Sequence, residues 1–441
     1  MRQRAEIGYA RVTLSTARRH RFCCDVTEYA ALVDECDTTP VLLPAESWRA
    51  GRWREVLGGL SGGPPPRDAG AHAVASLGGE YELVARVFAR RTTREYLGVV
   101  DEPRLLAAVA DRNRDSLLVV APPHALKVEL LRQLQAAECR WGVLTGRDLP
   151  AATFVAAKLL DGPAPREHGY LVCGEGVALE GPGHEPGPLE PQQLGGTPRS
   201  TLLIDAHGEG AHLNLGSVVI CGLPDEVERD STGIVAGGCS SVDGVAHCKR
   251  SHGKTTVVLA RELEADDLVV LSCCGFSIAG EGYPSSVSLV LAALEGRARS
   301  VMASDRIAGF ATWVIPLLAQ VCRGRGLGPL WVLVGEIEVN TRGGRSYVLV
   351  GDPAQGLGDL PRLDSGPVQV PPPGAIFELG VLAEPQVRPH APGHRSHERP
   401  AQPPHEPAAG GVRFTESLVE RAGPVVGPRV RRLRPILRAA A

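Results

Sequence analysis

The sequence predicts an α/β protein with a mainly parallel β-sheet flanked by helices. Short apolar runs of strand length, such as 116–121 and 268–271, alternate with segments whose apolar residues have helical spacing. Such alternation indicates βαβ units and a parallel sheet. Two of the apolar runs end at a reactive side chain beside a glycine, one at His207 and one at Cys274. In open α/β sheets the crevice lies at such strand ends, so both residues are candidates for chemistry.

The first 112 residues carry the weaker signals. Residues 40–44 predict a short strand between two prolines, and the Gly-Gly-Pro-Pro-Pro run at 62–66 predicts a loop or linker. Residues 80–88 and 102–110 have apolar positions at helical spacing, and Pro103 suits a first helical turn. We therefore expect helices within 78–111.

The α/β alternation begins at residue 116. Residues 162–200 are rich in Gly and Pro and predict a loop or small excursion. On either side of this segment the apolar patterns predict strands at 116–121, 141–144, 202–204, 218–220, 268–271, 300–303 and 347–350 and helices at 125–137, 151–160, 286–294 and 311–323.

Composition sets the class of protein. The net charge of −3 argues neither for nor against a nucleic-acid partner, and none is expected. No apolar run is long enough to predict a membrane span. The polar, arginine-rich start lacks the apolar centre of a signal peptide, so a cytoplasmic location is expected. The 11 cysteines, an odd number scattered through a long chain, predict reduced thiols.

His207 and Cys274 together predict a nucleophilic pair. A thiol attacks as thiolate, and a neighbouring imidazole can take its proton and later protonate a leaving amine. Backbone N–H groups beside a glycine can stabilise the oxyanion, and Gly208 and Cys274 could supply them. Buried structural thiols and a core histidine are the alternative interpretation of these residues.

At these residues the chain resembles the caspase-like cysteine peptidases, and most closely their CHAT and gingipain-type branches. The resemblance covers roughly residues 200–355. It rests on the His-Gly strand end, on the stretch 267–274 followed by Gly-Glu-Gly at 280–282, on the segment 298–304, and on Gly-Asp-Pro at 351–353. It implies a caspase-like fold in which His207 and Cys274 are the catalytic dyad and Gly208 is part of the oxyanion site.

Three residues depart from the pattern or bear on specificity. Cys273 stands where the family usually has alanine, which leaves two adjacent thiols as candidates. Asp305 and Arg306 follow the strand at 300–303, where the family has its primary specificity pocket and often a Trp. Asp305 would favour a basic substrate residue and Arg306 an acidic one. An exposed loop pair without a role in specificity is the alternative.

The expected domains are an unassigned N-terminal region (1–112), an α/β subdomain plus loop (113–199), a caspase-like catalytic domain (200–360) and a tail (361–441). Residues 366–411 are dominated by Pro, Gly, Ala and His and predict disorder. The last thirty residues are strongly basic and predict either a solvated tail or a docking segment for an acidic protein partner.

The sequence thus predicts a cysteine endopeptidase that needs no cofactor and cleaves a protein or peptide substrate. The alternative is a catalytically inactive caspase-like adaptor that binds a protein partner. A third hypothesis is a zinc-stabilised module at Cys239, His247, Cys248 and His252, although the spacing is not that of a common zinc finger. The Gly-Lys-Thr at 253–255 lacks the upstream glycine of a phosphate-binding loop, so nucleotide binding is not expected.

Overall fold

The structure is a computed structural model that describes most of residues 71–355. Contacts divide the chain into two units, Met1–Asp364 and Ser365–Ala441, and every described residue lies in the first. The described residues are 5–7, 10–12, 21–22, 41–42, 71–160, 169–222, 240–242, 245–248 and 256–355, without 112, 138, 175, 181–186, 273–274, 280–284, 307–326 and 343. The predicted helix at 311–323, the linker at 62–66 and the Pro-rich, basic tail therefore lie outside the described residues.

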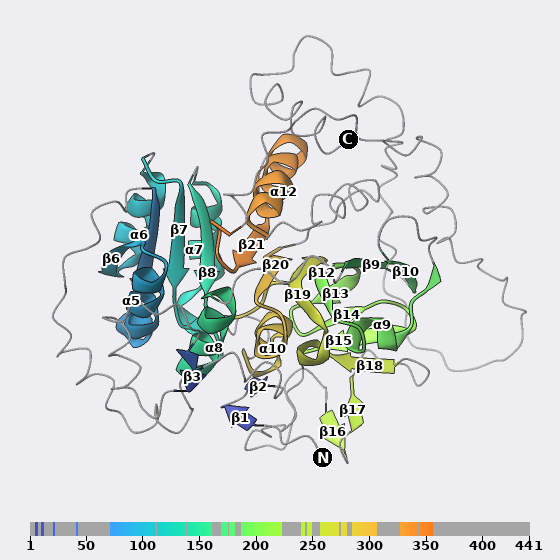
Figure 1. Cartoon of the computed structure of the whole chain (residues 1–441). Helices are drawn as coiled ribbons and strands as arrows, with labels where there is room; N and C mark the ends of the chain where they lie inside the picture. The colour runs from blue at the N-terminus through green and yellow to red at the C-terminus, as the bar shows by residue number, and fades with distance from the viewer. Residues whose placement is uncertain are drawn as a thin grey trace, which may run out of the picture. The chain divides into compact units, whose positions relative to one another are not determined.

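A single large sheet organises the described part of the chain (Figure 1). It has eleven strands in the order β11-β10-β9-β12-β19-β20-β21-β8-β7-β5-β6. Strands β9, β12, β19 and β20 run parallel to one another, and so do β21, β8, β7, β5 and β6. The strand direction reverses between β20 and β21, which are antiparallel. We call residues 72–160 the first block and the described residues of 169–355 the second block. The predicted α/β class, with a mainly parallel sheet flanked by helices, is confirmed.

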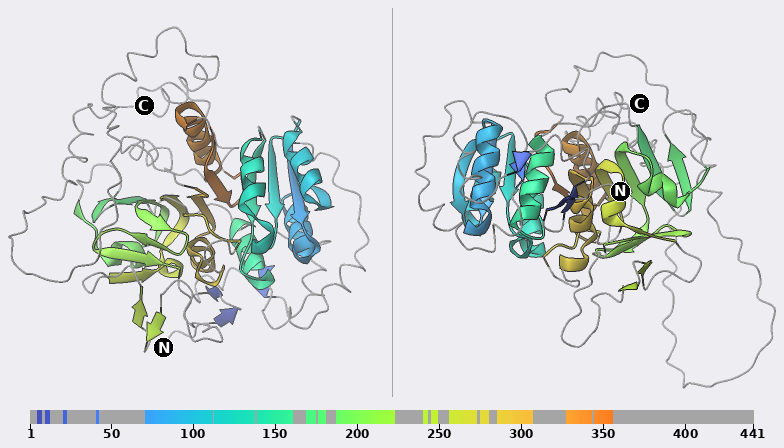
Figure 2. Two further views of the ribbon diagram at one scale, coloured as in Figure 1. Left: turned by 180° about the vertical axis from the view of Figure 1, so that it is seen from behind. Right: turned by 60° about the horizontal axis from the view of Figure 1, so that its bottom comes forward.

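The first block is built from residues 72–160. Its strands are β5 (His72–Leu77), β6 (Glu95–Val100), β7 (Ser116–Val120) and β8 (Arg140–Leu144), and its helices are α5 (Glu82–Arg91), α6 (Glu102–Ala110), α7 (Val128–Gln135) and α8 (Leu149–Leu160), with short 3-10 turns η1 (Gly79–Tyr81) and η2 (Pro123–Ala125). α5 packs against α8, whereas α6 packs against α7. The strands therefore lie between two helical layers (Figure 2).

Local sequence explains these boundaries. The Asp101 side chain accepts a hydrogen bond from the backbone N–H of Arg104, and Pro103 lies in the first turn, so α6 begins where the sequence predicts. β7 is buried along its whole length, as expected for a strand covered on both faces. The strands β5 and β6, on either side of α5, were not predicted.

The second block contains the strands β9 (Tyr170–Gly174), β10 (Val177–Glu180), β11 (Gly187–Pro188), β12 (Arg199–Asp205), β19 (Ala265–Leu271), β20 (Ser300–Ser304) and β21 (Tyr347–Val350). Its helices are α9 (Pro191–Gly195), α10 (Leu289–Glu295) and α12 (Leu327–Arg342), with 3-10 turns η5 (Ala260–Glu262) and η6 (Ser285–Val287). The prediction of a loop at 162–200 is wrong for its described residues. Tyr170–Gly174 pairs in parallel with β12 and belongs to the large sheet.

A smaller sheet covers part of the second block. It has the order β13-β14-β15-β18, formed by His207–Glu209, His212–Asn214, Val218–Cys221 and Thr256–Leu259. The predicted strand at 218–220 exists as β15, but it lies in this smaller sheet and not in the large one. Short pairs join β1 (Ala5–Ile7) to β2 (Ala10–Val12), β3 (Arg21–Phe22) to β4 (Val41–Leu42), and β16 (Ser240–Val242) to β17 (Val245–His247).

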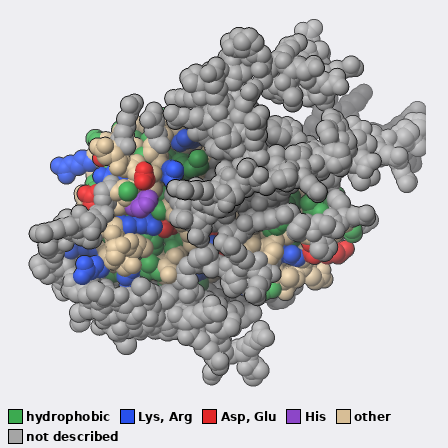
Figure 3. Space-filling model, turned by 45° about the horizontal axis from the view of Figure 1, so that its top comes forward, with side chains coloured by type: hydrophobic (Ala, Val, Ile, Leu, Met, Phe, Trp, Pro, Cys, Tyr) green, Lys and Arg blue, Asp and Glu red, His purple; other side chains and the backbone are tan. Residues whose placement is uncertain are grey.

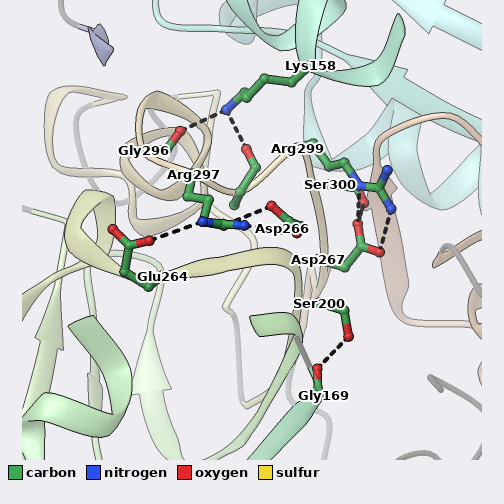
Figure 4. A network of polar contacts seen from close by, with 11 residues as sticks. Lys158, Gly169, Ser200, Glu264, Asp266, Asp267, Gly296, Arg297, Arg299 and Ser300 are labelled. Atoms are coloured by element: carbon green, nitrogen blue, oxygen red, sulfur yellow. Dashed lines mark hydrogen bonds and ion pairs between the residues drawn. The ribbon is translucent and has the colours of Figure 1, made fainter. Parts of the chain in front are cut away.

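The apolar core follows the central strands. Leu268, Val269 and Val270 of β19 are fully buried, and each such side chain contributes about 1.5–3 kcal/mol on transfer from water. Directly before Leu268 in the same strand, the carboxylate of Asp267 accepts two hydrogen bonds from Arg299 (3.1 and 3.0 Å) and one from Ser300 (Figure 4). Because both charges are buried, these bonds compensate the desolvation of the pair.

Lys158 connects the two blocks. Its ammonium group lies within hydrogen-bonding distance of the carbonyl oxygens of Leu294 (2.5 Å), Gly296 (3.0 Å) and Ala298 (2.5 Å), at the C-terminal end of α10 (Figure 4). Carbonyls at a helix end lack intrahelical partners and favour a cation. Burial lowers the pKa of Lys158 to about 7.

A second connection lies at the Gly-Asp-Pro segment. The N–H of Gly351 donates to the carbonyl of Val143 (2.8 Å), which continues the pairing of β21 with β8. The guanidinium of Arg94 donates two hydrogen bonds to the carboxylate of Asp352 (2.8 and 2.6 Å). The Gly-Asp-Pro segment thus joins the two blocks.

The surface shown in Figure 3 carries basic and acidic side chains interspersed over the described residues, in keeping with the small net charge. None of the helices in the described part of the chain has the length and apolarity that crossing a membrane would require. The sheet includes strands from three of the four expected regions, and the boundaries at 112, 199 and 360 remain predictions.

Candidate active site

The strands that carry the two candidate catalytic residues are direct neighbours. β12 and β19 pair in parallel from Arg199↔Ala265 to Asp205↔Leu271. Just beyond this pairing, the N–H of Ala206 donates to the carbonyl of Leu271 (3.4 Å). His207 therefore follows directly on the last contact between the strands, and the chain leaves β19 at the same sheet edge toward Cys273 and Cys274.

His207 starts a tight hairpin. It pairs with Asn214 across β13 and β14, and its side chain is exposed. An exposed imidazole at a strand end is open to a substrate. Its exposure speaks against the alternative interpretation, in which His207 is a buried core histidine. The next histidine in the chain, His212, is by contrast 1 % exposed on β14.

Gly208 has a packing reason to be glycine. A Cβ at this position would lie 2.4 Å from Leu213 Cδ2 and 2.7 Å from the carbonyl oxygen of His212. Any larger residue would push β13 away from β14 and displace His207. Packing therefore explains the glycine without any catalytic role. The oxyanion role of Gly208 stays a prediction.

Cys273 and Cys274 lie outside the described residues, but the residues on both sides of them are placed. Ser272 is buried directly after β19, and Gly275 is buried directly after the pair. The N–H of Phe276 donates to the carbonyl of Ser304 at the end of β20 (2.6 Å). The cysteine-bearing loop is therefore fixed on one side to β12 through Leu271 and on the other side to β20.

The hairpin and this loop also contact each other directly. A Cβ on Gly210 would come within 2.1 Å of Ser277 Cβ, and the carbonyl of Gly210 accepts a hydrogen bond from the N–H of Leu289 (2.8 Å). The turn after His207 is thus packed against the loop after Cys274 and the start of α10. The order β19, α10, β20 is the strand, helix and strand order that the sequence analysis expected.

Asp305 and Arg306, the predicted pocket residues, form an ion pair. Arg306 Nε lies 3.0 Å from Asp305 Oδ1, and a second nitrogen of the guanidinium contacts Gln135 of α7. The Asp305 side chain has 0 % exposure, whereas that of Arg306 has 37 %. Of the two, only Arg306 presents its charge to solvent, and the first block contributes to this part of the site through Gln135.

The cysteines described elsewhere are buried, namely Cys139, Cys173, Cys221 and Cys248. Burial raises the pKa of the Cys139 thiol to about 11 and that of Cys173 to about 12. Such thiols carry almost no thiolate at neutral pH and are poor nucleophiles. Two members of the suggested zinc cluster, Cys239 and His252, lie outside the described residues. Among all the residues that the structure describes, no group of three or more His, Cys, Asp or Glu side chains could hold a metal ion.

Ser272 was not singled out from the sequence, although its place beside the cysteine pair could have drawn attention to it. Its side-chain oxygen lies 2.8 Å from the position that a Cβ on Gly275 would take. Val270 and Ala303 pack on the same side of Gly275. Burial of a hydroxyl at this point is visible only in the folded chain.

Comparison with known proteins adds little. No protein-family model matches the chain, and neither does any curated protein. A solved structure described as "Structure of Protease" covers 65 % of this chain and 78 % of its own length, with 8 % identity and a TM-score of 0.34. Similarity at this level carries no argument about activity, so the functional proposal depends on the residues themselves.

Proposed function

We propose that this chain is a cysteine endopeptidase in which His207 and Cys274 act as a dyad. The observation that carries the proposal is the parallel pairing of β12 with β19, whose ends at Asp205 and Leu271 lie side by side. Parallel neighbours deliver the residues that follow them to one sheet edge, where α/β proteins form their crevices. The exposure of His207 and the anchoring of the cysteine loop to β20 support the same arrangement.

The chemistry uses the imidazole twice. His207 takes the proton of the Cys274 thiol, and the thiolate attacks the carbonyl carbon of the scissile peptide bond. The C–N bond of the tetrahedral intermediate then breaks, His207 gives the proton to the leaving amine, and an acyl-thioester remains on Cys274. Water, deprotonated by His207, hydrolyses the thioester. N–H groups at Gly208 and Cys274 are proposed to stabilise the oxyanion.

The partly exposed charge of Arg306 supports a preference for an acidic substrate residue next to the scissile bond. It follows β20, the neighbour of β19, and its guanidinium is partly exposed while the Asp305 carboxylate is enclosed. A carboxylate that binds Arg306 would find a guanidinium already held in place by Asp305 and Gln135. We therefore extend the proposal to substrates with Asp or Glu at this position.

The decisive experiment is a peptide-library cleavage screen with wild type, Cys274→Ala and His207→Ala. We expect both substitutions to abolish cleavage, while Cys273→Ala and His124→Ala, at the adjacent thiol and at an exposed histidine of the first block, retain it. Survival of cleavage in Cys274→Ala or in His207→Ala contradicts the proposal.

A thiol-directed peptide warhead separates the enzyme from the inactive adaptor. The enzyme reacts at Cys274, and mass spectrometry of the labelled chain locates the adduct. A folded wild-type protein that takes up no label near residues 273–274 supports the adaptor instead.

A further inference from the structure

Two of the buried cysteines, Cys221 and Cys248, share one small apolar cluster. Its buried members are Val219, Cys221 and Cys248, which are 0 %, 1 % and 4 % exposed. The partly buried side chains of Val257 and Leu259 pack against them. Neither cysteine belongs to a disulfide in the structure. The cluster therefore brings together two thiols from separate segments of the chain.

Strand register explains how the cluster forms. Val219 and Cys221 are alternate residues of β15, so their side chains point to one face of the smaller sheet. Their partners in β18 are Val257 and Leu259, which extend the same face. Cys248 comes directly after β17 and joins the cluster on this face. Through Cys248, the chain that leaves β17 packs on β15 and β18.

The β16–β17 hairpin is the element that this contact holds. Among the strands of the described chain, β16 and β17 pair only with each other, and Figure 1 shows them extending beyond β18. A two-stranded hairpin by itself is marginally stable in water, so it needs an anchor. A covalent bond from Cys248 to β15 would strengthen the apolar contact that provides this anchor.

We propose that Cys221 and Cys248 are a redox-active pair that forms a disulfide in the folded chain and so ties the β16–β17 hairpin to the smaller sheet. The oxidant is a small-molecule disulfide, of which oxidised glutathione is the probe used below. The inference is independent of the proposed peptidase, because neither thiol belongs to the candidate dyad.

The reaction is a double thiol–disulfide exchange. Local opening of the hairpin exposes Cys248, whose thiolate attacks one sulfur of oxidised glutathione. The S–S bond of glutathione breaks, one glutathione leaves as thiolate, and a mixed disulfide remains on Cys248. The Cys221 thiolate then attacks the Cys248 sulfur and expels the second glutathione. Two protein thiols are oxidised, one glutathione disulfide is reduced, and the two protons pass to the glutathione thiolates.

The test locates the disulfide by mass spectrometry. Folded wild type is incubated with oxidised glutathione, denatured in an alkylating reagent that blocks the remaining thiols, and digested with trypsin without reductant. We expect the peptide that carries Cys221 to be linked to the peptide that carries Cys248. Cys139 and Cys173, which are also buried but lie outside the cluster, should remain alkylated thiols and serve as matched controls.

Two variants identify the partner of Cys221. The tryptic peptide with Cys248 also contains Cys239, because no Lys or Arg lies between them. The linked peptide should persist in Cys239→Ala and disappear in Cys248→Ala. Linkage that persists in Cys248→Ala but not in Cys239→Ala contradicts the proposed pair.

Unfolding in urea gives an independent readout. Oxidised wild type should unfold at a higher urea concentration than reduced wild type, because a cross-link restricts the unfolded chain, and a reductant should remove the difference. Cys248→Ala should show no difference. The inference is overturned if Cys221 and Cys248 of folded wild type remain unlinked although the same treatment oxidises the urea-unfolded chain. The two thiols would then serve only as small apolar side chains.

Discussion

Gly210 and Ser277 lie so close that a Cβ on Gly210 would come within 2.1 Å of the Ser277 Cβ. One residue belongs to the turn after His207, and the other belongs to the loop after Cys274. Through this contact the turn that follows His207 packs against the described residues that follow Cys274.

Gly210→Ala should therefore displace the His207 hairpin. Overpacking of this kind costs about 1–3 kcal/mol, and we expect that loss in urea unfolding together with a large loss of peptide cleavage. Ser277→Gly removes the opposing Cβ, so the double variant should recover stability and cleavage. Failure of the double variant to recover either would show that the contact is not what holds the hairpin.

The Arg94–Asp352 pair should be a major link between the two blocks of the sheet. Asp352→Asn keeps the shape and the oxygen that accepts from the Ala354 N–H, but removes the charge. Because both side chains are about a tenth exposed, we expect a loss of about 2–4 kcal/mol in the free energy of unfolding. Glu82→Gln, which removes the charge from a helical pair with Arg86, should cost only about 0.5 kcal/mol. Equal losses in the two variants would contradict a special role for the link.

Lys158 should make stability depend on pH in the alkaline range. Burial places its folded pKa at about 7, below the usual value of 10.5, so between these values the unfolded chain binds a proton that the folded chain lacks. The free energy of unfolding of wild type, relative to Lys158→Met, should therefore rise with pH above 7, by at most about 1.4 kcal/mol per unit. Below pH 7 the difference should be constant.

Urea unfolding at pH 6, 7, 8 and 9 measures this slope. Lys127→Met, at an exposed lysine, controls for the loss of one positive charge. A flat difference between pH 7 and 9 would mean that the three carbonyl oxygens keep the ammonium charged despite its burial.

If the proposed peptidase activity holds, Arg306 should determine its charge preference. Charge-assisted hydrogen bonds contribute about 1.5–3 kcal/mol, so Arg306→Ala should lower kcat/KM for acidic peptides roughly tenfold to hundredfold. Arg306→Glu should shift the preference toward Lys or Arg, and Arg306→Lys should retain part of the acidic preference. An unchanged preference in Arg306→Glu would exclude Arg306 from the substrate site.

The sequence predicts well those elements whose own residues determine them. The fully apolar run at 268–271, the alternation from 116 to 160 and the Pro103 helix start all lie where expected. Tyr170–Gly174 was missed because its strand is short and lies among Gly and Pro, and pairing with β12 and β10 stabilises it. The strand at 218–220 was predicted, but its place in the smaller sheet was not, because an apolar run does not show which strand it pairs with.

In the candidate site, too, features determined by local sequence could be predicted, whereas features that depend on distant residues could not. That His207 and Cys274 follow strands could be inferred from the apolar runs, and the pairing of these strands is confirmed. The enclosure of Asp305 by Arg306 and Gln135 could not be inferred, because Gln135 is 171 residues away along the chain. The burial of Ser272 also depends on β20 and its own loop, and no local pattern encodes it.

The reversal of strand direction between β20 and β21 separates two rims of the molecule. The carboxyl ends of β5, β7 and β8 open on the rim opposite His207, where Gly78 and Gly79 are exposed and a Cβ on either would touch nothing. A reporter peptide grafted between these two glycines would project away from the candidate active site. The protein can therefore be tagged or tethered there while its chemistry is observed undisturbed.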